Sequence, residues 1–123
     1  MKSMLLNLSN HPSKNWSEGQ LSAAVALYGE VRDMQFPNVP PEMDDQGIME
    51  LAMRYLGEIK GYPDPVSHVH LMGEMSFTVA LVGLLQRAGI EVLCSTSERV
   101  VLEEVDGRKT MQFRFVRFRK YVF

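Results

Sequence analysis

Polar residues gather at four points where an apolar run of the sequence gives way to a short turn. These segments are residues 9–13, 37–38, 73–76 and 95–99, and they contain hydroxyls, amides, a histidine, two carboxylates and an arginine. The carboxyl ends of parallel strands meet at one edge of a sheet, and α/β domains bind ligands at that edge. The sequence therefore predicts a ligand site formed by four separate turns.

Two of these residues are candidates for proton transfer. His11 is a candidate general acid or base, or a phosphate contact, because imidazole titrates near neutral pH. A solvent-facing turn residue is an equally good interpretation of His11. Glu74 could act on a proton, or it could cap the following helix as an acid at its N-terminal end. We take His11 and Glu74 as the candidate catalytic residues.

The other side chains of the four turns are candidates for holding a ligand. The turn at 73–76 leads into a helix, whose free N–H groups and dipole attract anions. A serine at the position of Ser76 is more often an N-cap than a ligand contact, although one residue can do both. Arg99 would pair with a phosphate, or else with Glu98 or Glu103. The ligand-binding candidates are Ser9, Asn10, Asn38, Gly73, Met75, Ser76, Thr96, Ser97 and Arg99.

Other site chemistries find little support. His68 and His70 share one strand face, but no Cys or carboxylate spacing accompanies them, so we interpret them as core or interface histidines. We expect neither a metal nor a cofactor. The glycine motif of dinucleotide-binding domains, the P-loop and the Gly-x-Ser-x-Gly elbow are all absent. This argues against dinucleotide oxidoreductases, nucleoside triphosphatases and α/β-hydrolases.

The elements that must position these residues alternate between strands and helices. Ser17 is expected to cap a first helix, with Gln20 completing a capping box and Trp16 packing onto Leu21. The buried stripe of that helix is expected to be Leu21, Val25 and Tyr28. A second helix begins near residues 44–45 and ends before Gly61. The expected strands are residues 3–8, 30–36, 67–72 and 90–94.

The third helix and the C-terminal segment complete the pattern. Residues 76–88 are apolar nearly all round, so we expect burial against the sheet and against either another helix or a partner subunit. Residues 100–105 and 109–122 read as a hairpin about an Asp-Gly turn, with a bulge where the alternation breaks near Phe115. The predicted fold is α/β: one Rossmann-like three-layer domain over residues 1–123, with a mostly parallel sheet extended by an antiparallel hairpin.

Composition and charge bound the function further. The chain has 123 residues and a single cysteine, Cys94, which excludes an internal disulfide and suits a reducing cytoplasm. No apolar run approaches the ~20 residues that span a bilayer, so we expect no membrane association. Residues 1–107 carry 7 basic and 15 acidic side chains, whereas residues 108–123 carry 6 basic and no acidic ones. The basic end is either a solvated strand face beside acids or an RNA contact.

The sequence resembles small CRISPR-associated proteins with CARF-like Rossmann domains. The matching features are the polar turn at 9–12, the turn at 73–76 that leads into an apolar helix, residues 96–99, and the final hairpin. Glu74 stands where many such domains carry glycine or threonine. The resemblance implies a role in antiviral defence, as a homodimer that binds a cyclic oligoadenylate across its two-fold axis. Helix 76–88 would form the dimer contact.

Some small members of that group cleave the ring without a metal and are called ring nucleases. The resemblance implies that backbone N–H groups at Ser76 and Phe77 would hold phosphate, that Arg99 would offset charge, and that His11 or Glu74 would move protons. Two alternatives remain. One is a sensor that binds a nucleotide or RNA without cleaving it, and the other is an enzyme acting on another phosphorylated small molecule.

Overall fold

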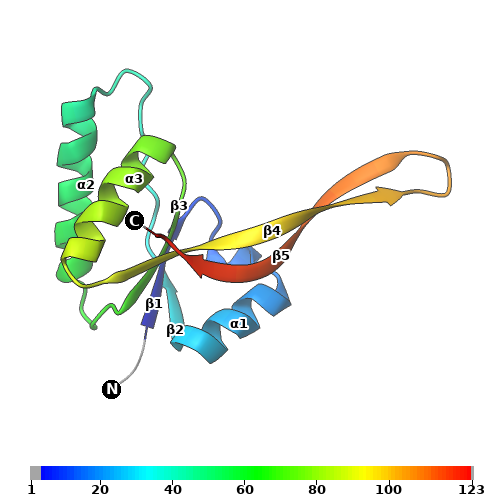
Figure 1. Cartoon of the computed structure of the whole chain (residues 1–123), viewed down its shortest axis with the longest axis horizontal. Coiled ribbons are helices and arrows are strands. Elements are labelled where there is room, and N and C mark those ends of the chain that lie inside the picture. The colour runs from blue at the N-terminus through cyan, green and yellow to red at the C-terminus, as the bar shows by residue number, and fades with distance from the viewer. Residues whose placement is uncertain (1–3, 123) are drawn as a thin grey trace.

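A computed structural model describes residues 4–122 of the chain. The sheet and helices follow one another in the alternating order that the sequence predicts (Figure 1). The elements are β1 (Met4–Ser9), a 3-10 turn η1 (Ser13–Asn15), α1 (Glu18–Tyr28), β2 (Glu30–Asp33), α2 (Asp45–Lys60), β3 (His68–Met72), α3 (Met75–Arg87), β4 (Glu91–Glu103) and β5 (Lys109–Lys120). Ser3, the expected first residue of the first strand, lies outside the described part.

The five strands form one mixed sheet in the order β2-β1-β3-β4-β5. The first four strands run parallel to their neighbours, and β5 runs antiparallel to β4. The chain leaves β1 toward β2 on one side and then crosses to β3 on the other side. The strand order thus reverses between β1 and β3, and in open parallel sheets the crevice at such a reversal is the usual ligand position.

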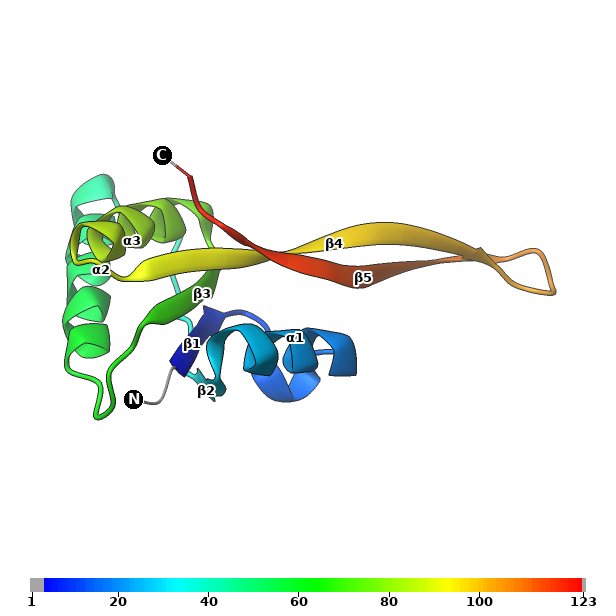
Figure 2. The ribbon, with the colours of Figure 1, turned by 60° about the horizontal axis from the view of Figure 1, so that its bottom comes forward.

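One face of the sheet is covered by α2 and α3 together (Figure 2). Alternate residues of β1, β3 and β4 meet the apolar stripes of these two helices in a single buried cluster. Phe77 is its largest fully buried side chain, and its ring meets Phe36 and Tyr55 edge to face, with centroids 5.3 Å apart in both pairs. This face of the sheet is therefore covered by a continuous layer of buried apolar side chains.

The opposite face is covered by α1 alone. Its buried apolar cluster is small: Leu5, Ala24, Leu93 and Phe118. The expected stripe on α1 is wrong at Leu21 and Val25, which are 40% and 53% exposed, because the small side chain of Ala24 is the one that packs on the sheet. The cap prediction is confirmed, since the Gln20 amide donates to Ser17 Oγ at 3.1 Å.

β4 and β5 pair over most of their length and leave the rest of the molecule as a long twisted ribbon (Figures 1 and 2). The expected turn at residues 95–99 is therefore wrong. Those residues continue β4, because β5 supplies a hydrogen-bonding partner beyond the point where β3 ends. The register shifts by one residue between Thr96 and Ser97, opposite Val116, which confirms the expected bulge.

The two apolar sides of α3 face the sheet and α2. The sequence left open whether a helix or a partner subunit covers the second side, and within this chain α2 does so. The large apolar side chains of α3 that stay exposed are Met75 and Val79. A homodimer through helix 76–88 remains a prediction.

Candidate functional site

A network of buried polar side chains lies at the carboxyl end of β1, on the face that α1 covers. Asn7 is 1% exposed, although its neighbours along β1 are leucines. Its Nδ2 donates to Asp33 Oδ1 at 2.8 Å and to the His11 carbonyl at 2.9 Å. Its Oδ1 accepts from Ser9 Oγ at 2.8 Å. These bonds fix which way the Asn7 amide points.

Asp33, at the end of β2, anchors this network and the following turn. Its carboxylate also accepts from the Ser13 amide at 3.0 Å and from Ser13 Oγ at 2.7 Å. Burial alone would raise the Asp33 pKa, but the hydrogen bonds from Ser13 and Asn7 together hold that pKa below its ordinary value. A charged Asp33 therefore ties the ends of β1 and β2 to the start of η1.

His70 joins the network from β3. The ladder pairs it with Asn7, and its Nδ1 lies 2.9 Å from Asn7 Oδ1. Because that oxygen can only accept, Nδ1 carries the proton and Nε2 presents a lone pair. Burial, with a smaller effect from His11, lowers the His70 pKa to about 4. His70 is therefore neutral at pH 7, and the interpretation of it as a buried, hydrogen-bonded histidine is confirmed.

Ser95 of β4 lies beyond the other nitrogen of His70. The distance from Ser95 Oγ to His70 Nε2 is 3.2 Å, and the hydroxyl is also 3.2 Å from Met72 Sδ. A thioether is a weak acceptor, so the imidazole lone pair is the stronger partner for the Ser95 proton. Asn7, His70 and Ser95 thus form a hydrogen-bonded row across three neighbouring strands.

This row ends in a cavity of about 420 Å³ on the α1 face of the sheet. The ribbon forms one wall, and the turn after β1 with the start of α1 forms the other. Aromatic rings, hydroxyls, amides and imidazoles line it, and the described lining residues include no Lys, Arg, Asp or Glu. The lining residues are His11, Asn15, Trp16, Ser17, Gln20, His70, Met72, Ser95, Thr96, Ser97, Phe113 and Phe115.

Trp16 holds the wall of this cavity in place. Its Nε1 donates to the His11 carbonyl at 3.0 Å, and its ring packs edge-on against His70 with centroids 5.1 Å apart. The ring also lies 6.0 Å from that of Phe118. Trp16 therefore contacts the site itself, whereas the sequence predicted only a helix-start contact with Leu21.

The candidates after β1 fall around two neighbouring hollows. His11 is exposed and lines the 420 Å³ cavity, close enough to His70 to lower the His70 pKa. Asn10 and Ser9 line a second hollow of about 360 Å³ between the ends of β1 and β2. The Ser9 hydroxyl is 7% exposed and already bonded to Asn7, so Ser9 supports the network.

The anion corner at the start of α3 is filled by the chain itself. Glu74, not Ser76, is the N-cap: its Oε1 accepts from the Phe77 amide at 2.7 Å. The Ser76 hydroxyl donates to the same carboxylate at 2.7 and 2.8 Å. The Phe77 amide bond, followed by the Ser76 hydroxyl, lowers the Glu74 pKa. This negative charge stands where a phosphate would bind, so the geometry does not favour the expectation that the Phe77 amide holds phosphate, which stays a prediction.

The remaining candidates near this corner do not line the 420 Å³ cavity. Gly73 serves packing, because a Cβ on it would lie 2.2 Å from Phe36 Cζ. Met75 is 79% exposed, and Asn38 is exposed in the loop that leads to α2. The cap interpretation of Glu74 is confirmed, and a catalytic role for it stays a prediction that the geometry does not favour.

The three candidates on β4 divide between the cavity and its edge. Thr96 and Ser97 line it, although Thr96 Oγ1 also donates to the Arg117 carbonyl at 3.1 Å across the bulge. Arg99 lies one step farther out, directly opposite Phe113 in the ladder. Glu98 pairs with Arg114 at 3.9 Å rather than with Arg99. Arg99 is thus a cation at the rim.

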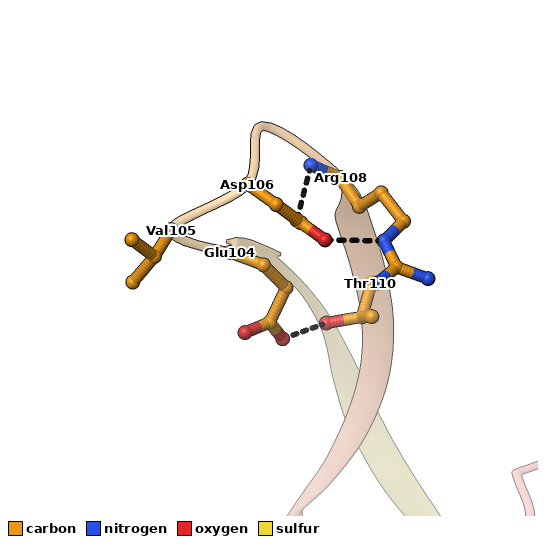
Figure 3. Close-up of a pocket in the computed structure, with 5 residues that line it drawn as sticks. All are labelled: Glu104, Val105, Asp106, Arg108 and Thr110. Carbon is orange, nitrogen blue, oxygen red and sulfur yellow. Dashed lines mark hydrogen bonds and ion pairs between the residues drawn. The ribbon is translucent and has the colours of Figure 1, made fainter.

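A larger hollow of about 560 Å³ lies at the far tip of the ribbon (Figure 3). It is formed by the turn and the start of β5, and its polar groups bind one another. Arg108 Nε donates to Asp106 Oδ2 at 2.6 Å, and Thr110 Oγ1 donates to Glu104 Oε1 at 3.3 Å. Bonds from Arg108 hold the Asp106 pKa below its usual range. These contacts stabilise the turn, and the hollow lies far along the ribbon from the sheet edge.

Other features of the described residues can be stated briefly. Within residues 4–122, no group of three His, Cys, Asp or Glu side chains is placed to hold a metal ion. None of the described helices has the length and apolar character to cross a bilayer. In the basic segment, Lys120 pairs with Glu91 of β4 at 3.0 Å. Part of the positive charge of this segment therefore lies beside an acid of β4.

Sequence reasoning missed the residues that connect the site. Asn7 and Ser95 are not among the predicted site residues, and the alternating pattern predicts Phe113 and Phe115 only as strand residues. One signal was available for Asn7: an amide inside an otherwise apolar strand needs a buried partner. The partner, His70, is 63 residues away, and only the pairing of β1 with β3 brings the two together.

The comparisons with known proteins identify a family and no function. No curated protein and no solved structure matches the chain. The model of one protein family matches residues 3–119, which is nearly the whole chain and includes every residue of the network and of the cavity. The chain therefore belongs to the family described as the uncharacterized protein MJ1673 family.

Proposed function

We propose that the chain binds a nucleotide in the 420 Å³ cavity beside the β1–β3 strand reversal. The composition of the lining carries the proposal. Aromatic rings of Trp16, Phe113 and Phe115 offer stacking surfaces for a base, and every base has a face on which to stack. Hydroxyls and side-chain amides around them suit the hydroxyls of a ribose. In this proposal the domain is a Rossmann-like nucleotide-binding domain.

The charge distribution around the cavity indicates which end of the nucleotide would lie inside it. The described lining of the inner cavity has no cationic Lys or Arg, so phosphates would lie at the mouth rather than at the base. Arg99 is paired with Phe113 in the ladder and lies on the same face of the ribbon, so it is a cation available at this mouth. His11 lies across the opening from the ribbon and would meet the sugar or a phosphate.

A cyclic oligoadenylate is the first nucleotide to test, because the sequence resembles CARF-like proteins. Ring cleavage, with His11 as the group that moves the proton, belongs to the same proposal, as does assembly into a homodimer. The supporting observation for His11 is that it lines the same cavity as the ribbon hydroxyls of Thr96 and Ser97. Glu74 is left out of this scheme because its carboxylate caps α3.

The single tryptophan provides the test. Trp16 lines the cavity, so a bound base should change its fluorescence saturably. We expect such a change with cyclic tetra-adenylate in the presence of a chelator, with ATP and adenosine as comparison ligands. Phe113→Ala should weaken binding about tenfold or more, since stacking on an aromatic contributes about 1–3 kcal/mol per base.

Met111→Ala is the matched control, because Met111 lies on the same ribbon face as Phe113 and does not line the cavity. Its affinity should equal that of the original chain. Chromatography of the recovered ligand separates a sensor, which returns an intact ring, from an enzyme, which returns a linear product. The absence of any saturable fluorescence change with all three ligands would overturn the proposal.

A further inference from the structure

The Ser95 hydroxyl is held in the arrangement that activates a nucleophile. Its Oγ lies 3.2 Å from His70 Nε2, and the opposite ring nitrogen lies 2.9 Å from Asn7 Oδ1. A hydroxyl against a base, with the base oriented by a third group, is the general pattern of nucleophilic catalysis. Ser95 is only partly buried and borders the cavity, whereas His70 is buried behind it.

The surroundings fix the tautomer that this chemistry needs. Asn7 Oδ1 must accept from Nδ1–H, because Asn7 Nδ2 is committed to Asp33 and to the His11 carbonyl. The lone pair of His70 therefore points along Nε2 toward Ser95. Trp16 and Phe118 pack edge-on against the imidazole ring, with centroids 5.1 and 5.8 Å away, and hold it in this orientation.

We propose that Ser95 is a nucleophile, with His70 as its base, toward a small carboxylic ester that carries a planar group. At Ser95, inside the cavity, a carbonyl electrophile fits better than a phosphoryl one, because the described lining lacks the Lys or Arg that phosphoryl transfer uses and Arg99 lies only at the rim. Asn15 and Gln20 line the same cavity, and side-chain amides are donors suited to the oxyanion of acyl transfer. The planar group would lie against Trp16 and Phe113. This inference does not depend on nucleotide binding.

The reaction is an ester hydrolysis in two steps. Ser95 Oγ forms a bond to the carbonyl carbon while its proton passes to His70 Nε2. The ester C–O bond then breaks, and His70 returns the proton to the departing alcohol, leaving an acyl group on Ser95. Water adds to the acyl carbon and gives a proton to His70. Release of the carboxylic acid restores the Ser95 hydroxyl with that proton, so the base is unchanged.

The test uses the full chain, a reporter-tagged alkyl fluorophosphonate and p-nitrophenyl acetate. A serine activated in this way displaces fluoride from the fluorophosphonate and keeps the tag, and peptide mapping locates it. We expect the tag on Ser95 and measurable ester hydrolysis. Ser95→Ala and His70→Gln should each lower the ester kcat/KM by about 100-fold or more. Ser22→Ala, on the exposed surface of α1, should leave it unchanged.

The pH profile supplies a second measurement that needs no variant. The titratable group that faces His70 is His11, from the turn after β1. Since His70 stays neutral well below pH 6, the labelling rate should change by less than about threefold between pH 7.5 and pH 5. A base with an ordinary histidine pKa would lose about 30-fold over that range.

Each outcome decides the inference. A tag on Ser95 with a flat pH profile supports it, even if His70→Gln fails to fold. A tag on any other residue, no labelling at all, or a Ser95→Ala variant with the original hydrolysis rate overturns it. Trp16 fluorescence titration of Ser95→Ala with ATP, run in parallel, reports nucleotide binding separately from the ester chemistry.

Discussion

The two faces of the sheet are built from the same strands and differ in what they bury. On the side of α2 and α3, alternate strand residues such as Leu6 and Leu8 enter a continuous hydrocarbon core. On the side of α1, the intervening positions of β1 include Asn7 and Ser9, which are equally buried but polar. Two helices seal the first face, and one helix covers the second.

The difference shows how a small domain can hold both a core and a candidate site. The sealed face supplies stability through packing, so its residues need only fit one another. The α1 face has fewer apolar contacts, and each buried polar group on it requires a partner. Asn7 and His70 meet that requirement through each other and through the exposed Asp33, and the cavity lies where α1 and the ribbon leave the row open at Ser95.

The largest effect should come from opening the sealed face. Phe77→Ala removes a fully buried ring that packs against Phe36 and Tyr55. We expect a loss of about 3–5 kcal/mol in the free energy of unfolding, measured by urea denaturation. Phe113→Ala is the matched control: this ring is 73% exposed on the ribbon, and its loss should cost less than about 0.5 kcal/mol. Equal losses for the two variants would contradict the distinction between core and ribbon.

Acid should weaken the polar face specifically, through His70. Its pKa is lowered from 6.5 to about 4, so between these values the unfolded chain binds a proton that the folded chain does not. Stability is therefore full above about pH 6.5 and falls as the pH drops toward 4. Between pH 7 and pH 5 this group alone should remove about 2 kcal/mol.

The measurement is the urea unfolding free energy at several pH values, with His70→Gln as the comparison. The variant lacks the titrating group, so most of the slope between pH 7 and pH 5 should disappear. A slope that persists in His70→Gln would assign the acid sensitivity to other groups. Ordinary carboxylates titrate mostly below this range and do not mimic the effect.

Much of the fold is predictable from local signals in the sequence. Caps and stops were readable at Ser17 and at the end of the second helix because they involve residues three or four apart, and Asp106-Gly107 marked the hairpin. Residues 95–99 form a strand where the sequence predicts a turn, because hydroxyl residues suit both turns and strands. Whether it forms a strand depends on β5, which is distant in the sequence.

The candidate site was predictable only as a region. The edge of the sheet and the residues His11, Thr96 and Ser97 followed from the alternating pattern, and they line the cavity. The connection from Asn7 through His70 to Ser95 could not be read, because it needs the register of three strands. At the start of α3 the geometry does not favour the predicted anion site for a local reason: the Phe77 amide already donates to the Glu74 side chain.

A smaller loss of stability is expected from a change at the start of α3, where the chain leaves the end of β3. Glu74→Ala removes the cap from the Phe77 amide and should lower the Tm by about 2–5 °C. Nucleotide binding, followed by Trp16 fluorescence, should not change, because Glu74 does not line the cavity. Glu42→Ala, in the exposed loop before α2, serves as the control with no shift in Tm. Loss of ring cleavage without loss of Tm would restore Glu74 as a catalytic candidate.

The smallest expected effect is a change in ATP affinity at Arg99. It tests whether the ligand-binding surface on the α1 face extends onto the ribbon. Arg99 lies on the same ribbon face as Phe113, whereas Arg114 is one position along β5 on the opposite face. Because Arg99 is exposed, Arg99→Ala should leave stability unchanged and weaken ATP binding by about twofold to fivefold at low salt. Adenosine has no phosphate, so its affinity should stay the same. Arg114→Ala should alter neither ligand, and 0.5 M salt should remove the Arg99 effect, since surface charges are then screened. An equal loss for ATP and adenosine would mean that Arg99 supports the base instead, and the phosphates would then have to lie elsewhere on this face.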